Sequence, residues 1–112
     1  EPRSLTAGRA DFLEPYAAAL GEADAVAIAE PYHAARLSRP GAPGALDVEA
    51  LVARLAAGGR EAFRAPDPPA LAEELLSRLK EGDVVVVMSS GAFGNLCGRL
   101  VQGLAAREAL AP

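Results

Sequence analysis

The stretch VVVVMSSGAFGNLCGRL, residues 84–100, constrains the fold more than any other part of this sequence. A run of four valines is typical of a strand, because β-branched side chains pack well on a pleated sheet. The small residues and glycines that follow favour a tight turn. Apolar residues at helical spacing come next. The stretch therefore predicts a strand over residues 84–88, a glycine turn (SSGAFG) and a helix over residues 93–106.

The rest of the chain alternates between helical and strand-like patterns. Apolar residues at helical spacing predict further helices, and short apolar runs predict further strands. In chain order we expect a helix over residues 6–20, a strand over 24–29, a long exposed loop over 30–45, a helix over 47–58, a strand over 61–65 and a helix over 66–79. This order predicts an α/β domain with a mostly parallel sheet covered by helices on both faces.

Prolines, glycines and one aspartate set several of the expected boundaries. Asp47 has the position of an N-cap, and the glycines at residues 58–59 end the same helix. Pro15 should kink the first helix unless that helix begins close to it. With only three Phe and two Tyr in the chain, the core should be aliphatic and built from Ala, Leu and Val.

The start of the chain suggests that it is part of something longer. It begins Glu1-Pro2-Arg3-Ser4 without an initiator methionine, and its pattern opens on a helix. We therefore expect residues 1–112 to form one domain of a longer protein, in which a first strand ending near Arg3 has been truncated.

The charge pattern argues against nucleic acid as a partner. The formal net charge is −4, acidic residues are spread along the chain, and Lys80 is the only lysine. A phosphate-binding face needs clustered Lys and Arg instead. No apolar run approaches the ~20 residues of a membrane span, so we expect a soluble, cytoplasmic protein without a membrane partner. The single cysteine, Cys97, excludes an internal disulfide and a multi-cysteine zinc site.

The glycine turn lies where ligands bind in open α/β sheets, beyond the carboxyl end of a strand. Its spacing, Gly91-x-x-Gly94-x-x-x-Gly98, matches neither the dinucleotide fingerprint GxGxxG nor the P-loop GxxxxGK[ST]. Two interpretations stay open. Backbone N–H groups at the start of the last helix, with Ser89 and Ser90, could bind an anion. Alternatively, the serines and glycines only form the turn and cap the helix, with Gly98 marking close packing on the sheet.

Other chemistry-bearing residues give weaker signals. His33 stands in the Pro-rich loop without a second His or a Cys nearby, so a metal site is not expected. Cys97 is expected to be a buried, inert thiol. Arg36 and Arg39 fit surface solubility better than a substrate clamp. With no Ser/His/Asp set and no paired carboxylates, the sequence supplies no complete active site, and no catalytic or metal-binding residue is predicted.

Two segments resemble the signatures of a known family. EPRSLT and VVVVMSSGAFGNLCGRL resemble the two signature segments of the third, C-terminal domain of Mur ligases. The pattern is most similar to the murein peptide ligase branch, in which the first segment reads F-E-P-R-S-N-T and closes a strand. The last segment of that branch reads V-M-S-N-G-G-F-G-G-I-H. The resemblance covers nearly the whole chain, and its specific motifs are these two segments.

The resemblance implies a Rossmann-like, three-layer domain with a six-stranded, mostly parallel sheet, used as the mobile lid of a three-domain ligase. The full enzyme would use ATP and Mg²⁺, held mainly by a central domain, to phosphorylate the carboxyl group of UDP-N-acetylmuramate. The amine of the peptide L-Ala-γ-D-Glu-meso-diaminopimelate would attack that acyl phosphate, in peptidoglycan recycling. This chain alone would bind no cofactor and be inactive. The alternatives are an L-alanine-adding muramate ligase domain and a non-catalytic Rossmann-like ligand-binding domain.

The resemblance also implies site residues. Those expected to bind substrate are Arg3, Ser4, Ser89, Ser90, Gly91, Ala92 and Phe93. Residues 89–93 would line the pocket of the incoming amino compound, and residues 3–4 would lie near the closed interface. The sequence departs from the family pattern at five positions: Leu5, Ser90, Ala92, Asn95 and Cys97. Because Cys97 stands where His is common, any role of that His is unsupported here.

Overall fold

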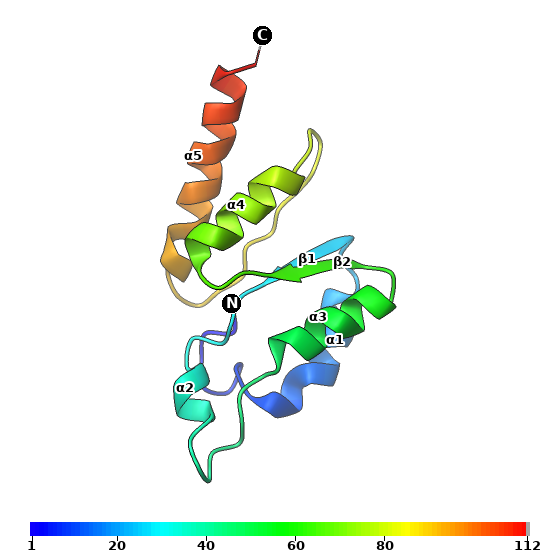
Figure 1. The fold of residues 1–112 in the computed structure, drawn as a ribbon, viewed down its shortest axis with the longest axis vertical. Coiled ribbons are helices and arrows are strands. Elements are labelled where there is room, and N and C mark those ends of the chain that lie inside the picture. Colours follow the sequence, from blue (N-terminus) through cyan, green and yellow to red (C-terminus); the bar gives the residue numbers. More distant parts are fainter. Residues whose placement is uncertain (112) are drawn as a thin grey trace.

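The computed structural model describes residues 1–111, and helices alternate with strands through its first part (Figure 1). The elements in chain order are η1 (Ala10–Phe12), α1 (Leu13–Leu20), β1 (Ala25–Ile28), α2 (Ala34–Leu37), α3 (Val48–Ala57), β2 (Glu61–Arg64), α4 (Pro68–Arg78), η2 (Phe93–Asn95) and α5 (Leu96–Ala109). In this part of the chain, no helix has both the length and the apolar character needed to cross a bilayer.

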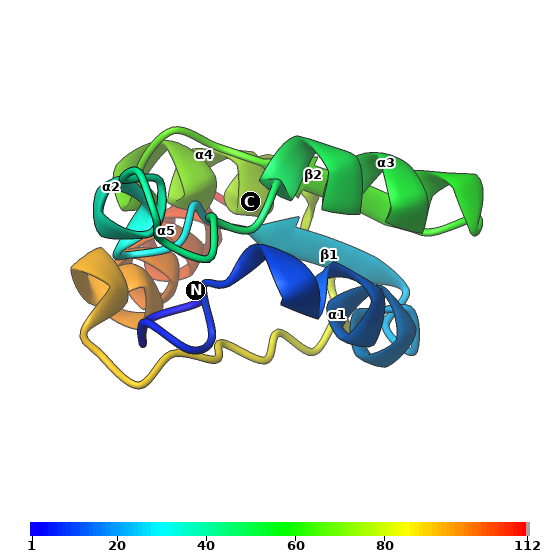
Figure 2. The ribbon, with the colours of Figure 1, turned by 90° about the horizontal axis from the view of Figure 1, so that it is seen from below.

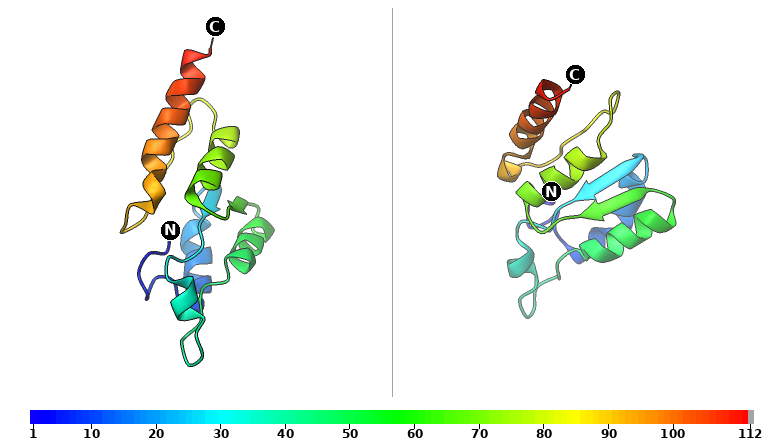
Figure 3. Two further views of the ribbon diagram at one scale, coloured as in Figure 1. Left: turned by 60° about the vertical axis from the view of Figure 1, so that its left-hand side comes forward. Right: turned by 45° about the horizontal axis from the view of Figure 1, so that its top comes forward.

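The strands β1 and β2 form a small parallel sheet, in which Ala25 pairs with Glu61 and Ile28 with Arg64. Helix α1 packs against α3, and α4 packs against α5. Figures 1 and 3 show these two helix pairs on opposite sides of the sheet. The three layers confirm the α/β class with parallel strands, because a parallel pair needs a helical crossover that lies on a face of the sheet.

Each face of the sheet carries its own apolar cluster. Side chains alternate along a strand, so Val26 and Ile28 point toward α3 while Ala27 packs against the other cluster. The α3-side cluster consists of Val26, Ile28, Leu46, Val48, Leu51 and Leu55. The α4-side cluster consists of Ala29, Phe63, Ala65, Leu71, Ala72, Phe93, Leu96 and Leu100. The core is mostly aliphatic, as expected, with two phenylalanines added.

Local sequence explains where the helices begin. The Asp47 carboxylate accepts from the Ala50 N–H at 3.0 Å, which confirms it as the N-cap of α3. Asp67 caps α4 in the same way, accepting from the Ala70 N–H at 2.8 Å. Helix α1 begins at Leu13, so Pro15 lies in its first turn, where a missing N–H breaks no helical hydrogen bond. No kink is therefore required.

Several expectations about secondary structure are wrong. The helix expected over residues 6–20 begins only at Ala10, with η1, and continues as α1 from Leu13. The sheet of the described residues has two strands, where the resemblance implies six. Residues 84–88 belong to no strand, and Val84 and Val86 are 86% and 72% exposed. The physical reason is that a strand exists only through hydrogen bonds to a neighbour, and the described residues place none beside this segment. The expected long loop over 30–45 contains the short helix α2, whose Leu37 is buried. The prolines and glycines of this loop lie on either side of α2 and leave room for one helical turn between them.

Candidate functional site

The two signature segments meet in the structure although residues 7–83 lie between them in the sequence. The nitrogen of Glu1 donates to the Met88 carbonyl at 2.8 Å, and the Ser89 hydroxyl donates to the Glu1 carboxylate at 2.9 Å. The Glu1 carboxylate also lies 3.5 Å from an Arg3 nitrogen, and its side chain is only 9% exposed. These contacts bring Arg3 to the glycine turn, which follows residues 84–88.

Arg3 lies between an aromatic ring and a glycine. Its guanidinium carbon is 3.5 Å from the centre of the Tyr32 ring, a cation–π contact. On the other side, a Cβ added to Gly91 would be only 2.6 Å from that same carbon. The guanidinium thus occupies the space that any larger residue at position 91 would need. We call Arg3, Tyr32 and Gly91 the arginine clamp.

Tyr32 is the member of the clamp that the sequence did not reveal. It follows the carboxyl end of β1 by four residues, and its ring meets the His33 ring edge-on with centroids 4.9 Å apart. The Tyr32 N–H donates to the Pro2 carbonyl at 2.9 Å, which fixes the two loops side by side. An aromatic residue just beyond the carboxyl end of a strand is the signal that could have identified it.

The turn itself is held in an unusual backbone conformation. The Gly91 N–H donates to the Ser89 hydroxyl at 3.1 Å. Phe93, Gly94 and Asn95 all have positive φ, at 50°, 56° and 57°. Phe93 is tolerated there because its side chain is 5% exposed and packs in the α4-side cluster. Its backbone can face a ligand, but its ring belongs to the core.

The capping interpretation of the turn holds only in part. Ser89 braces the turn, yet helix α5 has Asn95 at its N-cap position and no side-chain capping bond. Gly98 does not mark packing on the sheet, since an added Cβ would meet the Asn95 side chain at 2.6 Å. The close helix contact is instead made by Gly103, which lies against Leu76 of α4.

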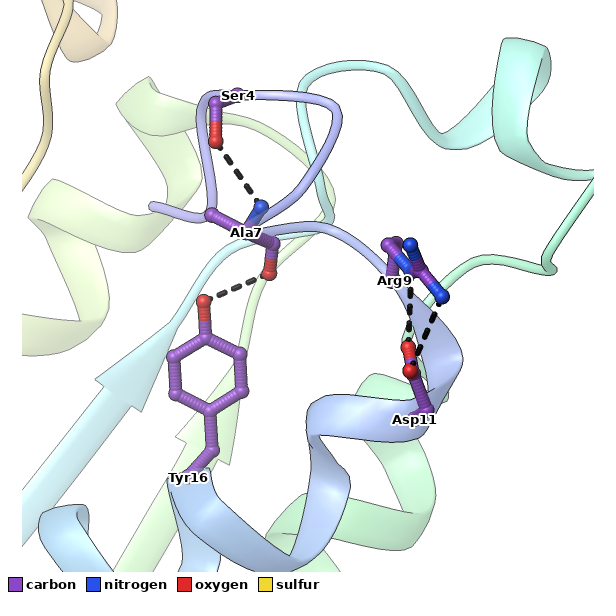
Figure 4. A network of polar contacts seen from close by, with 5 residues as sticks. All are labelled: Ser4, Ala7, Arg9, Asp11 and Tyr16. Atoms are coloured by element: carbon purple, nitrogen blue, oxygen red, sulfur yellow. Dashed lines mark hydrogen bonds and ion pairs between the residues drawn. The ribbon is translucent and has the colours of Figure 1, made fainter.

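Ser4 lies in a neighbouring turn rather than in the clamp. Its hydroxyl accepts from the Ala7 N–H at 3.0 Å, and the Tyr16 hydroxyl donates to the Ala7 carbonyl at 2.6 Å (Figure 4). Burial raises the pKa of the Tyr16 phenol. In the same segment, Arg9 makes a two-bond pair with Asp11 at 3.0 and 3.1 Å. These contacts anchor the chain that leads from Arg3 to α1.

The remaining candidates lie apart from any site. Cys97 is exposed, so the expectation of a buried thiol is wrong: it occupies the outward side of α5, while Leu96 and Leu100 face the core. Arg36 and Arg39 are exposed, in keeping with the surface role expected of them. Among residues 1–111, no three His, Cys, Asp or Glu side chains gather closely enough to hold a metal ion.

What the clamp can do follows from its geometry. The ring contact uses the face of the guanidinium, so the N–H groups around its edge stay available to an acceptor. The Arg3 side chain is 30% exposed and its one carboxylate partner is 3.5 Å away, longer than a good charge-assisted hydrogen bond. An arginine in this state suits a planar carboxylate or a phosphate. The expected roles of residues 3, 4 and 89–93 in binding stay predictions.

Comparison with known proteins finds relatives that carry the same enzyme name. The UDP-N-acetylmuramate–L-alanine ligase of Xylella fastidiosa strain M12 is 34% identical over 92 residues, which are 81% of this chain and 18% of that ligase. The enzyme of the same name from Methylibium petroleiphilum is 31% identical over 107 residues, 95% of this chain and 22% of the ligase. No family model matches the chain, and no solved structure does.

Over most of its length this chain is therefore similar to members of the Mur ligase family. The chain spans about a fifth of the length of the relatives it matches. The relatives carry the name of the L-alanine ligase, so the narrower resemblance to murein peptide ligases is not confirmed.

Proposed function

We propose that this chain is the C-terminal domain of an ATP-dependent Mur ligase and that the arginine clamp receives the carboxylate of the incoming amino compound. The observation that supports this most directly is the position of Arg3, stacked on Tyr32 and lying on Gly91. The two segments that resemble the family signatures thereby form one surface. Two relatives that match 81% and 95% of the chain are named UDP-N-acetylmuramate–L-alanine ligases.

In the proposed reaction, ATP phosphorylates the carboxyl group of UDP-N-acetylmuramate, and an amine attacks the acyl phosphate. The C–O bond to phosphate breaks as the amide C–N bond forms, phosphate leaves, and the amine loses a proton. ATP and Mg²⁺ would be held outside this chain, because residues 1–111 gather no set of metal-binding side chains. The contribution of this chain would be to orient the amine.

Orientation has a physical basis in the clamp. A bidentate bond between the Arg3 edge and a carboxylate fixes both the position and the plane of the substrate. Holding a nucleophile in this way contributes through proximity, which can lower a barrier by several kcal/mol when the alignment is good (roughly 7–11 at most). The small side chains of the turn let a substrate approach the backbone N–H groups of Ser90 and Ala92 closely, while the Gly91 N–H is taken by the Ser89 hydroxyl.

Two compounds are candidates for the substrate that supplies the amine. The tripeptide L-Ala-γ-D-Glu-meso-diaminopimelate is favoured by the SSGAFG turn, which is closer to the murein peptide ligase pattern than to the G-A-G-N-I-G turn of the L-alanine ligases. Free L-alanine is favoured by the names of the relatives. Both carry a carboxylate that the clamp could bind.

The test is an assay of ADP release by the natural protein that contains this chain. UDP-N-acetylmuramate, ATP and Mg²⁺ are supplied with either tripeptide or L-alanine, and kcat/KM is compared. We expect the tripeptide value to exceed the L-alanine value at least ~10-fold, about 1.4 kcal/mol of discrimination. The opposite preference would assign the L-alanine reaction. No ADP release with either amine would reject the ligase function in favour of a non-catalytic ligand-binding domain.

A further inference from the structure

The Glu1 carboxylate lies beside the arginine clamp, where the termini of several loops meet near the start of the chain (Figure 2). The Glu1 side chain is 9% exposed, and its Oε1 accepts from the Ser89 hydroxyl at 2.9 Å while lying 3.5 Å from an Arg3 nitrogen. Ser89 is itself held, because its hydroxyl also accepts from the Gly91 N–H. A negative charge is therefore fixed next to the positive charge of the clamp.

Only one oxygen of this carboxylate is engaged by the protein. Oε1 makes both contacts, and Oε2 of Glu1 has no hydrogen-bond partner among residues 1–111. In that part of the chain no side-chain oxygen is both shut off from solvent and without a partner, so Oε2 reaches solvent. An ionised carboxylate accepts hydrogen bonds at both of its oxygens. Glu1 therefore keeps one accepting oxygen for a donor that enters from solvent.

The position of Glu1 is unfavourable for a ligand that carries only negative charge. A carboxylate or phosphate bound to the edge of Arg3 would lie close to the Glu1 carboxylate, and like charges that close repel each other. Arg9, the next arginine along the chain, does not offset this repulsion, because it is paired with Asp11. A repulsive group beside a binding group is a means of rejecting the wrong ligand. The arrangement therefore discriminates against simple anions.

An α-amino-acid group has the complementary pair of charges. Its carboxylate and its ammonium are attached to one carbon, so its two charges are close together, as those of Arg3 and Glu1 are. The carboxylate can accept from the guanidinium edge while the ammonium donates to Oε2 of Glu1. Neither bond displaces the Tyr32 ring, which contacts the face of the guanidinium. In this arrangement each charge of the ligand faces a charge of opposite sign.

We propose that Glu1 binds an ammonium group of the incoming amino compound, and that the compound presents a free α-amino-acid group to Arg3 and Glu1 together. The proposal rests on the proposed function for the kind of substrate and adds Glu1, which is not among the site residues expected from the sequence. Both candidate substrates meet the requirement. L-Alanine is itself such a group, and the meso-diaminopimelate residue of the tripeptide ends in one.

Ligand binding to the natural protein that contains this chain tests the proposal without turnover. The probes are L-alanine and propionate, which have the same carboxylate and the same carbon chain and differ only in the ammonium group. Their dissociation constants are measured by titration calorimetry, with UDP-N-acetylmuramate, Mg²⁺ and ADP present and ATP left out. The natural protein is compared with Glu1→Gln, in which the amide oxygen can still accept from the Ser89 hydroxyl.

The two probes should respond to Glu1→Gln in opposite directions. Binding of L-alanine should weaken at least ~10-fold, because a hydrogen bond between two charged groups is lost. Binding of propionate should become tighter, because the like charge beside Arg3 is removed. Glu22→Gln is the matched control and should change neither constant, since it removes the same charge from an exposed residue before the amino end of β1, whereas Tyr32 of the clamp follows the carboxyl end.

Three results would overturn the proposal. Weaker binding of both probes to Glu1→Gln would mean that Glu1 only maintains the structure around Arg3. Unchanged binding of L-alanine to this variant would exclude Glu1 as the ammonium partner, and so would a natural protein that binds propionate but not L-alanine. The ligase function has a separate test, because an absence of ADP release would reject that function whatever the two dissociation constants are.

Discussion

Gly91→Ala tests whether position 91 must be glycine because Arg3 lies on it. The added Cβ would be 2.6 Å from both the Cζ and the Nε of Arg3, well inside van der Waals contact. Gly91 does not have a φ in the left-handed region, so alanine brings no backbone strain of its own. The cost of the substitution should therefore come through Arg3 alone.

The magnitude follows from what Arg3 loses when it moves. A guanidinium is the far end of a flexible side chain, so it swings away and the backbone stays in place. It then gives up the Tyr32 ring, worth ~0.5–1 kcal/mol, and the Glu1 pair, worth ~0–1 kcal/mol. We expect Gly91→Ala to lower the free energy of unfolding by ~1 kcal/mol and by no more than ~2 kcal/mol.

A double-mutant cycle in urea isolates this contribution. Gly91→Ala should cost ~1 kcal/mol in the natural background and less than ~0.5 kcal/mol when Arg3 is already alanine. Gly58→Ala is the matched control, because its added Cβ meets the Leu55 carbonyl at 3.4 Å, ordinary contact, and its φ of −82° suits alanine. If the two backgrounds give equal losses, Gly91 acts through the backbone and the clamp argument fails.

Three further predictions concern other contacts. Because burial raises the pKa of Tyr16 above 10, its contribution to stability is complete below about pH 10 and is lost as pH rises through the folded value. Tyr16→Phe should flatten that alkaline loss in melting curves, and an unchanged slope would exclude Tyr16 as its source. Asp67→Ala should lower the free energy of unfolding by ~0.5–2 kcal/mol through loss of the α4 cap, with Asp67→Asn nearly neutral; equal losses would point to charge instead. In the proposed ligase, Arg3→Ala should reduce kcat/KM at least ~10-fold, and Arg3→Lys should not restore it; wild-type kinetics would remove Arg3 from the site.

Local signals in the sequence correctly predicted the features that depend on residues close together in the chain, such as the ends of helices. Asp47 caps α3, and α3 ends at Gly58 as expected, because capping involves residues three or four positions apart. Asp67 carries the same signal before Pro68, so the α4 cap was also open to prediction. The valines of residues 84–88 predict a strand, and these residues form none. What the pattern could not supply is the neighbour with which an extended segment pairs.

The same limit applies to the arginine clamp, because its contacts join residues that are far apart in the chain. The two signature segments were identified from the sequence, but the aromatic residue that contacts Arg3 was not. Tyr32 is 29 positions from Arg3 and reaches it only because the Pro2 carbonyl bonds to the Tyr32 N–H. The wrong prediction of a buried Cys97 has a similar cause. Its exposure depends on which face of α5 meets α4, a choice set by Gly103 against Leu76.

The side-chain contacts of the clamp are too weak to explain its order on their own. The ring contact and the ion pair together contribute only ~1 kcal/mol, a net value that already includes the entropy of ordering the arginine side chain. The backbone must therefore hold Arg3 near Tyr32, through the bonds of Glu1 to Met88 and of Pro2 to Tyr32. An arginine held in this way keeps most of the N–H groups at the edge of its guanidinium available to an acceptor. A bound carboxylate would then compete with Glu1 for that edge and leave the Tyr32 contact intact.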